Sequence, residues 1–437
     1  MAGCVSEVWS RTGACALGVL ALVLWMGEGS VMAQTPEVPR IDSVAPLRPQ
    51  PAQRDPAVIW YDDFDDLASP ARYGEKSGEL VDTEHLGDRG MSLRMYYATG
   101  ERGTGNRKVF FGDAPTYPEK VVRRGEKFTD VYWRVYVKHQ RGWTGGGPAK
   151  MSRATSMTSA NWQQAVIAHV WSGAEGLTLD PASGVQGDQV VTRRYNDFSR
   201  LHWLGNSPGS KFLIHSTEQA GRWVCVEARA KLNTPGKSDG YTALWIDGIF
   251  QTERKNLNWR ESYDGHGINA VFLEAYWNRG SPVDQSRYMD EFVISTKPIG
   301  PVTVPLDPTL IKTPYFGPAK QNAWEIELAV RLEKEEPGAV RISESTDLNR
   351  AGGRQYGNPI VGEDVWGTVA WKSRPIAGEG LSVVVNAANG SFVGPLVGKT
   401  SLTPGSEYFC RVRQQGDGKW SEWSEWHQPF QTVAAAK

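Results

Sequence analysis

The polar side chains between residues 150 and 195 supply the groups that an elimination reaction beside a carboxylate needs. Such a reaction requires a cation or amide to neutralise the carboxylate, a base to remove the proton from the adjacent carbon, and an acid to protonate the leaving oxygen. Strand parity places Gln163 and His169 on one face, together with Trp171. The candidates for these roles are a lysine, an arginine, a glutamine, a histidine and a tyrosine: Lys150, Arg153, Gln163, His169 and Tyr195.

The positions of Lys150 and Arg153 set a condition on the strand that carries them. An ideal strand points side chains three residues apart to opposite faces, so both reach one site only if a bulge or a loop intervenes. His169, which Trp171 follows two residues later, is equally well explained as a packed, hydrogen-bonded histidine.

Motifs of several other chemistries are missing from the sequence. It contains no His-Glu-x-x-His, no paired Cys-x-x-Cys, no phosphate-binding loop and no Gly-x-Ser-x-Gly. A glycosidase would need two carboxylates that face each other across a cleft. Glu227 and Glu274 are candidates, but their spacing alone does not pair them.

A cationic and phenolic strand face is predicted over residues 131–138. Apolar side chains alternate there with Arg134, Tyr136 and Lys138, which is the period of a strand with one buried face. The polar face is either a groove that binds an acidic sugar or a solvated sheet surface. Trp171 and Tyr276 are the aromatic candidates for contact with a sugar ring. Trp171, Trp203 and Trp277 are either such sugar platforms or residues packed in the core and between the sheets, which is the more common role of tryptophan.

Acidic residues at the two ends of the same segment predict a structural cation site. Four aspartates fall between residues 62 and 66, and Asp290 lies far along the chain. If the first and last strands lie side by side, Asp63 and Asp290 would hold Ca²⁺, which needs several oxygen ligands. The alternative is a solvated acidic turn. The chemistry itself requires no cofactor.

The composition limits the classes of partner. The 437 residues carry 48 Lys and Arg against 49 Asp and Glu, a formal net charge of −1. This balance removes the bulk attraction to phosphates that drives most binding to nucleic acids and anionic membranes, so neither is expected as a partner. The 47 Gly, 26 Pro and 11% aromatic residues favour strands and turns over long helices.

Residues 1–33 are predicted to be a signal peptide, so we expect a secreted protein, periplasmic or extracellular. Arg11 precedes an apolar run over 14–26, which is shorter than the about 20 residues that span a bilayer. Val31-Met32-Ala33 offers the small residues that a signal peptidase recognises. No membrane association is expected after cleavage.

Proline-rich segments divide the mature chain. They predict a linker at 34–56 and a second linker at 301–314. Cys225 and Cys410 fall in different parts of this division and are expected to be buried free thiols, because a scaffold held by disulfides would show more cysteines at closer spacing.

Residues 57–300 are predicted to form an all-β unit. Period-two alternation is clear over 131–138 and 224–232, and Asp247-Gly248 is a strong hairpin signal. Many short strands separated by turns in a unit of this size favour two packed sheets, a β-sandwich or jelly roll.

Four runs in this unit carry a likeness to a known fold. They are Gly221-Arg222-Trp223-Val224-Cys225-Val226-Glu227, Lys231-Leu232-Asn233-Thr234-Pro235-Gly236, Trp245-Ile246-Asp247-Gly248 and Tyr288-Met289-Asp290-Glu291-Phe292-Val293-Ile294-Ser295. The first three resemble the central hairpin, and the last the closing strand, of concanavalin-like jelly rolls in polysaccharide lyases of the glucuronan-lyase and alginate-lyase groups. Lectin-like and carbohydrate-binding jelly rolls share this hairpin.

The resemblance implies roles for the candidate residues. His169 or Tyr195 would be the base, Tyr195 the acid, and Lys150 or Arg153 the group that neutralises the carboxylate. The alginate lyases that use a Gln-Ile-His triplet have glutamine where this chain has Ile167. The implied partner is an acidic polysaccharide or another glycan.

Residues 315–433 are predicted to form a separate β-sandwich. The run Leu402-Thr403-Pro404-Gly405-Ser406-Glu407-Tyr408 resembles the turn and strand of a fibronectin type III domain, with Tyr408 in the tyrosine-corner role. Trp420-Ser421-Glu422-Trp423-Ser424 is a Trp-Ser-x-Trp-Ser box. Arg411 and Arg413 share a strand face, so their guanidinium groups are expected to interleave with the rings of Trp420 and Trp423.

Two classes of function follow. The first is an exported polysaccharide lyase that cleaves a uronate-containing chain by β-elimination. The second is a glycan-binding or adhesion protein without catalysis, which the same fold and the appended domain also fit.

Overall fold

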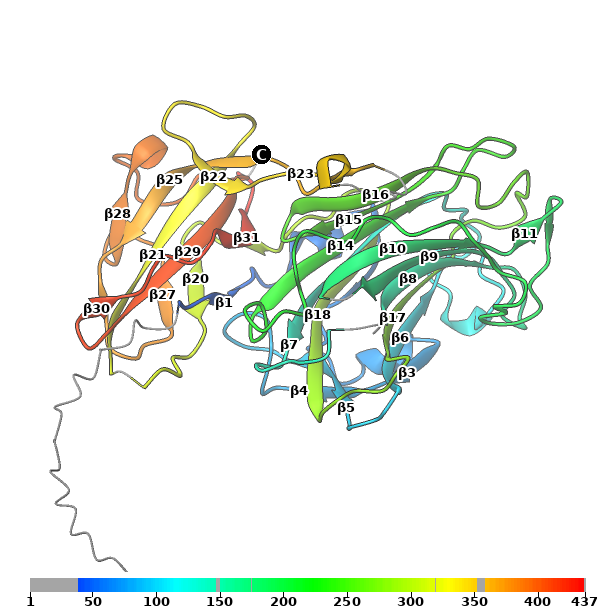
Figure 1. Ribbon diagram of the computed structural model, residues 1–437, viewed down its shortest axis with the longest axis horizontal. Coiled ribbons are helices and arrows are strands. Elements are labelled where there is room, and N and C mark those ends of the chain that lie inside the picture. The colour runs from blue at the N-terminus through cyan, green and yellow to red at the C-terminus, as the bar shows by residue number, and fades with distance from the viewer. Residues whose placement is uncertain (1–37, 147–149, 174, 319, 352–357, 436–437) are drawn as a thin grey trace, which may run out of the picture. The chain divides into compact units, whose positions relative to one another are not determined.

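The computed structural model describes residues 38–146, 150–173, 175–318, 320–351 and 358–435. The described residues belong to one compact unit, and the predicted signal peptide at 1–33 lies outside them. Figure 1 shows strands nearly throughout, which confirms the predicted all-β class. The described helices are single 3-10 turns, none of them able to cross a membrane: η1 (Pro51–Arg54), η2 (Ser69–Arg72), η3 (Pro118–Lys120), η4 (Leu348–Ala351) and η5 (Gly394–Leu396).

One large antiparallel sheet carries most of the candidate residues and is called the site sheet. Its strand order is β13-β10-β9-β8-β17-β6-β3. Neighbours such as β8 and β17 lie more than a hundred residues apart in sequence, as in a jelly roll. The strands are β13 (His202–Trp203), β10 (Gly176–Ser183), β9 (Gln164–Gly173), β8 (Lys150–Met157), β17 (Ala270–Tyr276), β6 (Gly103–Phe110) and β3 (Glu75–Ser77).

A second antiparallel sheet, the back sheet, packs against the site sheet. Its order is β16-β15-β14-β7-β18-β5-β4, with β2 also paired to β18. The predicted hairpin at Asp247-Gly248 joins β15 to β16, and both turn residues have positive φ, 50° and 68°. The strands are β16 (Ile249–Leu257), β15 (Gly240–Ile246), β14 (Trp223–Lys231), β7 (Asp130–His139), β18 (Gln285–Ser295), β5 (Ser92–Tyr97), β4 (Glu79–Val81) and β2 (Val58–Asp62).

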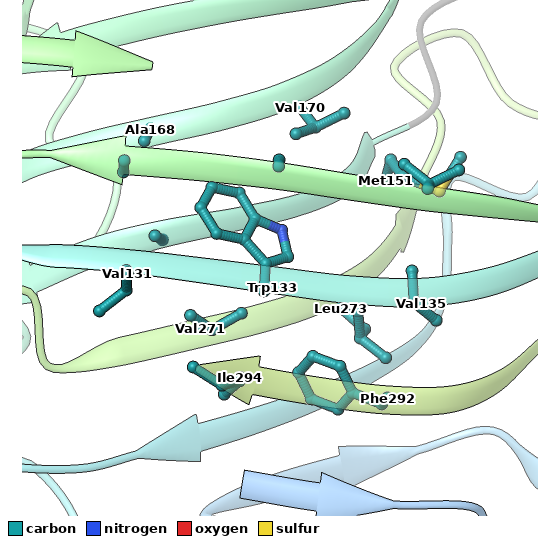
Figure 2. Packing of buried hydrophobic residues seen from close by; sticks show 14 of the residues in the cluster. Val131, Trp133, Val135, Met151, Ala168, Val170, Val271, Leu273, Phe292 and Ile294 are labelled. Atoms are coloured by element: carbon teal, nitrogen blue, oxygen red, sulfur yellow. The ribbon is translucent and has the colours of Figure 1, made fainter. Parts of the chain in front are cut away.

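The main hydrophobic core lies between these two sheets. Figure 2 shows Trp133 of β7 among side chains from both sheets, including Ala168 and Val170 of β9. The alternation in each strand sends every second side chain into this core. In β9 the residues between the core positions, Ile167, His169 and Trp171, therefore point to the opposite face.

The prediction for the polar face of residues 131–138 is wrong. This strand is β7 of the back sheet, and Arg134, Tyr136 and Lys138 are buried on the side away from the site sheet. Arg134 pairs with a carboxylate at 3.4 Å, Tyr136 accepts a backbone N–H at 2.9 Å, and Lys138 pairs with two carboxylates at 2.7 Å each. Buried polar groups need such partners, so the strand forms neither a substrate groove nor a solvated surface. The partners are, in that order, Glu291, Val302, and Asp42 with Glu84.

The two proline-rich segments are not free linkers. In the first, β1 (Ile41–Val44) pairs with β20 (Thr309–Lys312) of the second, and β20 pairs with β27 (Ser382–Val384). Ile41 and Val44 are fully buried in a second core cluster. The proline density predicts an extended chain, and both segments are extended. They form paired strands with buried apolar side chains rather than free linkers.

The C-terminal residues form a nine-stranded sheet, and its hydrophobic core cluster also includes side chains of the back sheet, namely Tyr136 of β7 and Trp223 and Cys225 of β14. Its main order is β19-β31-β29-β21-β25-β22, all antiparallel except β19 with β31. Two short pairs of strands lie outside the three large sheets. They are β11 (Val185–Gln186) with β12 (Gln189–Val190), and β23 (Thr346–Asp347) with β24 (Ile360–Val361). The nine strands are β19 (Thr303–Val304), β31 (His427–Thr432), β29 (Glu407–Gly416), β21 (Gln321–Leu332), β25 (Val365–Ser373), β22 (Val340–Ser343), β26 (Ile376–Ala377), β28 (Gly390–Phe392) and β30 (Lys419–Trp420).

The predicted arginine–tryptophan ladder is present in this C-terminal sheet. Arg413 lies 4.6 Å from the ring centroids of both Trp420 and Trp423, and Arg411 lies 4.9 Å from that of Trp423. A third ring, Trp426, extends the ladder at 4.7 Å from Arg411. The contacts give the Trp-Ser-x-Trp-Ser box a structural role.

Two smaller predictions for buried groups are also confirmed. The hydroxyl of Tyr408 accepts the backbone N–H of Thr403 at 3.0 Å, as a tyrosine corner requires. Cys225 and Cys410 are buried free thiols.

Candidate active site

A row of paired residues crosses the outer face of the site sheet and forms the floor of the candidate site. Directly opposed residues of antiparallel strands point to the same side. His169 of β9 is opposite Arg153 of β8, which is opposite Phe272 of β17. The row continues at its two ends with Asp180 of β10 and with Lys108 of β6 followed by Glu75 of β3.

A bulge in β8 brings Lys150 to the same face as Arg153. Lys150 pairs with Trp171 and Ser152 pairs with Val170, so Met151 is the extra, unpaired residue of the bulge. Met151 then lies in the core. The bulge that Lys150 and Arg153 need in order to reach one site is therefore present.

The centre of the floor is a charged cluster of Arg153, Glu274 and Tyr195. Arg153 is fully buried and donates to Glu274 Oε1 at 2.6 Å, to Asn196 Oδ1 at 2.8 Å and to the oxygen of Tyr195. The Tyr195 hydroxyl donates to Glu274 Oε1 at 2.8 Å. Burial opposes ionisation of Glu274, but Arg153 and Lys150 outweigh it and lower its pKa to about 2. Glu274 is thus a carboxylate and Arg153 is its counterion.

Lys150 is a buried amine on the wall of a cavity. Burial lowers its pKa to about 8, helped by the positive charge of Arg153 and opposed by Glu274. The Nζ atom lies 5.1 Å from the ring centroid of Tyr276 and 5.5 Å from that of Trp171. A lysine in this state is partly neutral slightly above neutral pH, which is a requirement for a general base.

The site cavity has a volume of about 570 Å³ and opens on the outer face of the site sheet. A second cavity of about 330 Å³ adjoins it, and the two share Glu274 and Tyr276. The site cavity is lined by aromatic, amide and charged side chains: Lys150, Trp171, Asp180, Tyr195, Asn196, Phe198, Trp203, Glu274, Tyr276 and Asn278.

His169 lies below this cavity rather than on its wall. It is buried, and its ring stacks under that of Trp203 at a centroid distance of 5.9 Å. Within the described residues neither ring nitrogen has a hydrogen-bond partner. Burial and then the charge of Arg153 hold its pKa well below the ordinary value, so the ring is neutral.

A bulge in β9 places Gln164, rather than Gln163, on the same face of the strand as His169. Ser156 pairs with Val166 and Met157 pairs with Gln164, so Ala165 is the extra residue and both Ala165 and Val166 face the core. Gln164 is fully buried and its Oε1 accepts the backbone N–H of Asn196 at 2.8 Å. Gln163 lies outside the strand and donates to a loop carbonyl, that of Thr192. The ideal parity that placed Gln163 beside His169 is therefore wrong.

The acidic residues proposed to share Ca²⁺ have other partners. Arg48 lies 3.3 Å from Asp63 and 3.0 Å from Glu291, so a guanidinium group neutralises this cluster. Asp290 is fully buried and accepts the backbone N–H of Leu86 at 2.9 Å. In the part of the chain that the structure describes, no group of three or more His, Cys, Asp or Glu side chains could hold a metal ion.

Several residues of the site cavity escaped the sequence analysis. Glu274 was considered only as a glycosidase carboxylate, yet the alternation of Phe272, Glu274 and Tyr276 in β17 would have placed it beside Tyr276. Asp180 carried no local signal, because its place depends on the pairing of β10 with β9 and β13, whereas Trp203 was considered as a packing residue or a sugar platform. The residues missed are Asp180, Asn196, Phe198 and Asn278, together with Glu274 in its role beside Arg153.

Comparisons with known proteins give a likeness of fold. No protein-family model and no curated protein matches the chain. Solved structures that match in part include alginate lyase vAL-1 from a Chlorella virus, with 13% identity, a TM-score of 0.41, and coverage of 55% of this chain and 100% of that one. The PL-14 alginate lyase from Aplysia kurodai has 13% identity, a TM-score of 0.38, and coverage of 55% and 99%. The endo-β-1,4-glucuronan lyase from Trichoderma reesei has 12% identity, a TM-score of 0.35, and coverage of 60% and 96%.

Proposed function

We propose that the chain is a polysaccharide lyase that cleaves a uronate-containing glycan by β-elimination in the site cavity. The observation that carries the proposal is that Lys150 and Tyr195 line one cavity while Arg153 and Glu274 form a neutralised pair beneath them. A base and an acid on one wall are what removal of a proton and departure of a sugar oxygen require.

Lys150 is the proposed base. Its lowered pKa, about 8, gives a neutral amine near that pH, and the amine can take the proton from the carbon beside the carboxylate. The bond from the next carbon to the glycosidic oxygen then breaks, and the electron pair of the C–H bond becomes the new double bond. Arg153 does not neutralise the substrate in this scheme, because it is fully buried and already paired with Glu274.

Tyr195 is the proposed acid. Burial raises its pKa, and Glu274 raises it further, so the phenol holds its proton until the leaving oxygen takes it. Arg153 donates a hydrogen bond to the phenol oxygen and would stabilise the phenolate that forms.

Asn196 is the proposed contact for the uronate carboxylate. Its Oδ1 accepts from Arg153 at 2.8 Å, which fixes the other amide atom as the N–H₂ donor. Asn196 lines the cavity, so this donor can stabilise negative charge as the proton leaves.

The test is an ultraviolet assay of the unsaturated product with alginate, glucuronan and hyaluronan as substrates. The wild type is expected to raise the absorbance with at least one polymer. Lys150→Met and Tyr195→Phe should each lower the rate by about 10²–10⁴-fold, the usual contribution of a general base or acid. Lys76→Met, at an exposed lysine of β3, is the matched control and should keep the wild-type rate.

Two outcomes would contradict this assignment of roles. A wild-type rate in Lys150→Met would remove the proposed base. A loss in His169→Ala equal to that in Lys150→Met, with the fold intact, would return the role of base to His169.

The second candidate function is glycan binding without catalysis. It is favoured by the exposed aromatic rings around the cavity, with Phe198 58%, Tyr276 39% and Trp203 38% exposed. A protein of this kind would be retained by the same polymers in an affinity gel and would raise no absorbance with any of them.

Export and the type of the C-terminal sandwich are parts of the same proposal. The apolar segment before Ala33 supports a signal peptide, which mass spectrometry of the secreted chain would test. The contact of Tyr408 with Thr403 and the arginine–tryptophan ladder support a fibronectin type III-like sandwich. The calcium site at Asp63 and Asp290 stays a prediction.

A further inference from the structure

The charges on the wall of the site cavity are few, and they are unevenly placed. Of its ten described lining residues, Lys150 is the single cation and the carboxylates are Glu274 and Asp180. Glu274 is neutralised by Arg153. Asp180 has neither an ion pair nor a side-chain hydrogen bond within the described residues, and its pKa, which burial raises to about 6, leaves it ionised at neutral pH.

This balance disfavours a chain with a carboxylate on every sugar. When Lys150 acts as the base it is uncharged, and Asp180 is then the one unpaired charge on the described wall. A uronate beside Asp180 would place two like charges together in a partly buried site, which costs binding energy.

Asp180 instead stands beside exposed aromatic side chains, which are of the kind that can stack on uncharged sugars. Trp203 of β13 pairs with Ala182, which is on the same face of β10 as Asp180. Phe198 lies parallel to Trp203 at a centroid distance of 6.4 Å, and both rings are exposed. An aromatic face takes the C–H side of a sugar ring, while a carboxylate accepts its hydroxyl or amide hydrogens.

Asp180 and Lys150 are far enough apart to contact different rings of one glycan. β10 and β8 are separated by β9, which puts their backbones about 10 Å apart at about 4.8 Å per strand. The cavity that both residues line is about 570 Å³.

Resting on the lyase function proposed above, we infer that the substrate is an acidic heteropolysaccharide in which the uronate at Lys150 is followed by a sugar without a carboxylate at Asp180, Trp203 and Phe198. Asp180 is a specificity-determining residue that selects against polymers made of uronate alone.

The test compares polymers of the two kinds with wild type and Asp180→Asn. Hyaluronan represents a uronate that alternates with an uncharged amino sugar derivative, and alginate and glucuronan represent polymers of uronate alone. The wild type should have the higher kcat/KM on hyaluronan. Asp180→Asn keeps the shape of the side chain and removes its charge, so it should raise the ratio of alginate or glucuronan to hyaluronan cleavage about tenfold. Glu175→Gln removes an exposed carboxylate at the start of β10 and should leave the ratio unchanged.

The outcomes separate this inference from the proposed function. Cleavage of alginate or glucuronan in preference to hyaluronan, with a ratio that Asp180→Asn does not change, overturns the inference and leaves the lyase function standing. If no polymer is cleaved, the lyase function fails, and retention in affinity gels of the same polymers decides the inference. Stronger retention by hyaluronan that Asp180→Asn weakens supports it, and equal or stronger retention by alginate or glucuronan overturns it.

Discussion

Glu274 opposes burial, which is the largest effect on the pKa of the proposed base Lys150 and lowers it. It is the main group that raises the pKa of Lys150, while Arg153 and Lys108 lower it. The proposed mechanism needs neutral Lys150, so the rate should increase with pH and level off above about 8. The pH profile thus reports on the electrostatic interaction between Glu274 and Lys150.

We predict that Glu274→Gln shifts this rising limb to lower pH. Removal of the negative charge takes away the effect that raises the pKa of Lys150 against burial, Arg153 and Lys108, so this pKa falls below about 8 and the base form is present at lower pH. The measurement is the pH dependence of kcat/KM for the variant and the wild type. Glu119→Gln, at an exposed carboxylate of η3, should keep the wild-type profile.

The same substitution also tests the buried ion pair. Replacing the Glu274 carboxylate by an amide would leave the guanidinium of Arg153 buried without its counterion, which costs about 3–5 kcal/mol of stability. Thermal unfolding checks this cost. A limb that moves to higher pH in folded protein would show that Glu274 does not set the pKa of Lys150.

At the scale of the strands, two bulges decide which side chains reach the cavity. The extra residue Met151 in β8 brings Lys150 level with Arg153, and the extra residue Ala165 in β9 exchanges Gln163 for Gln164. Both bulges send an additional apolar side chain into the core. The positions of Lys150 and Gln164 therefore depend on the burial of Met151 and Ala165 in the core.

These bulges also mark the limit of prediction from the sequence. Period-two alternation was sufficient for the core face of β7 and for the shared face of His169 and Trp171. It could not show that residues 131–138 are covered on both faces, because Arg134 and Lys138 have the polarity of a solvated strand and their partners lie far along the chain. Strand order, which sets Asp180 beside Trp203, is equally non-local.

Gln164 is predicted to be a positioning residue for the loop that carries Tyr195 and Asn196. Its Oε1 accepts the N–H of Asn196, so Gln164→Met leaves that donor without a partner. We expect kcat to fall about tenfold with little change in KM. The reason is that the proposed acid Tyr195 would be displaced, whereas the aromatic side chains that line the site cavity would not. Gln164→Glu keeps an acceptor at this position and should restore part of the rate.

A purely structural role of Gln164 would give a different result. Both variants would then lose stability without a selective loss of kcat, and Gln164→Glu would not recover it. Gln186→Met, at an exposed residue of β11, is the control for the exchange of glutamine for methionine.

At the scale of the whole molecule, β1 near the start of the described chain packs against residues near its end. β1 pairs with β20, and the backbone N–H of Ile41 donates to His427 Nε2 at 2.7 Å. Ile41 therefore connects residues at the two ends of the described chain within one core cluster. A fragment limited to residues 315–433 would lack both β1 and β20.

We predict that Ile41→Ala destabilises the protein although it lies in a segment with the composition of a linker. Ile41 is fully buried with Leu310 and Trp324, and the loss of such a side chain costs about 2–5 kcal/mol. Urea unfolding followed by tryptophan fluorescence measures the loss. Val397→Ala, at a residue 71% exposed, should change the unfolding free energy by less than about 0.5 kcal/mol. Equal stability of the two variants would mean that the N-terminal strand is not part of the folded core.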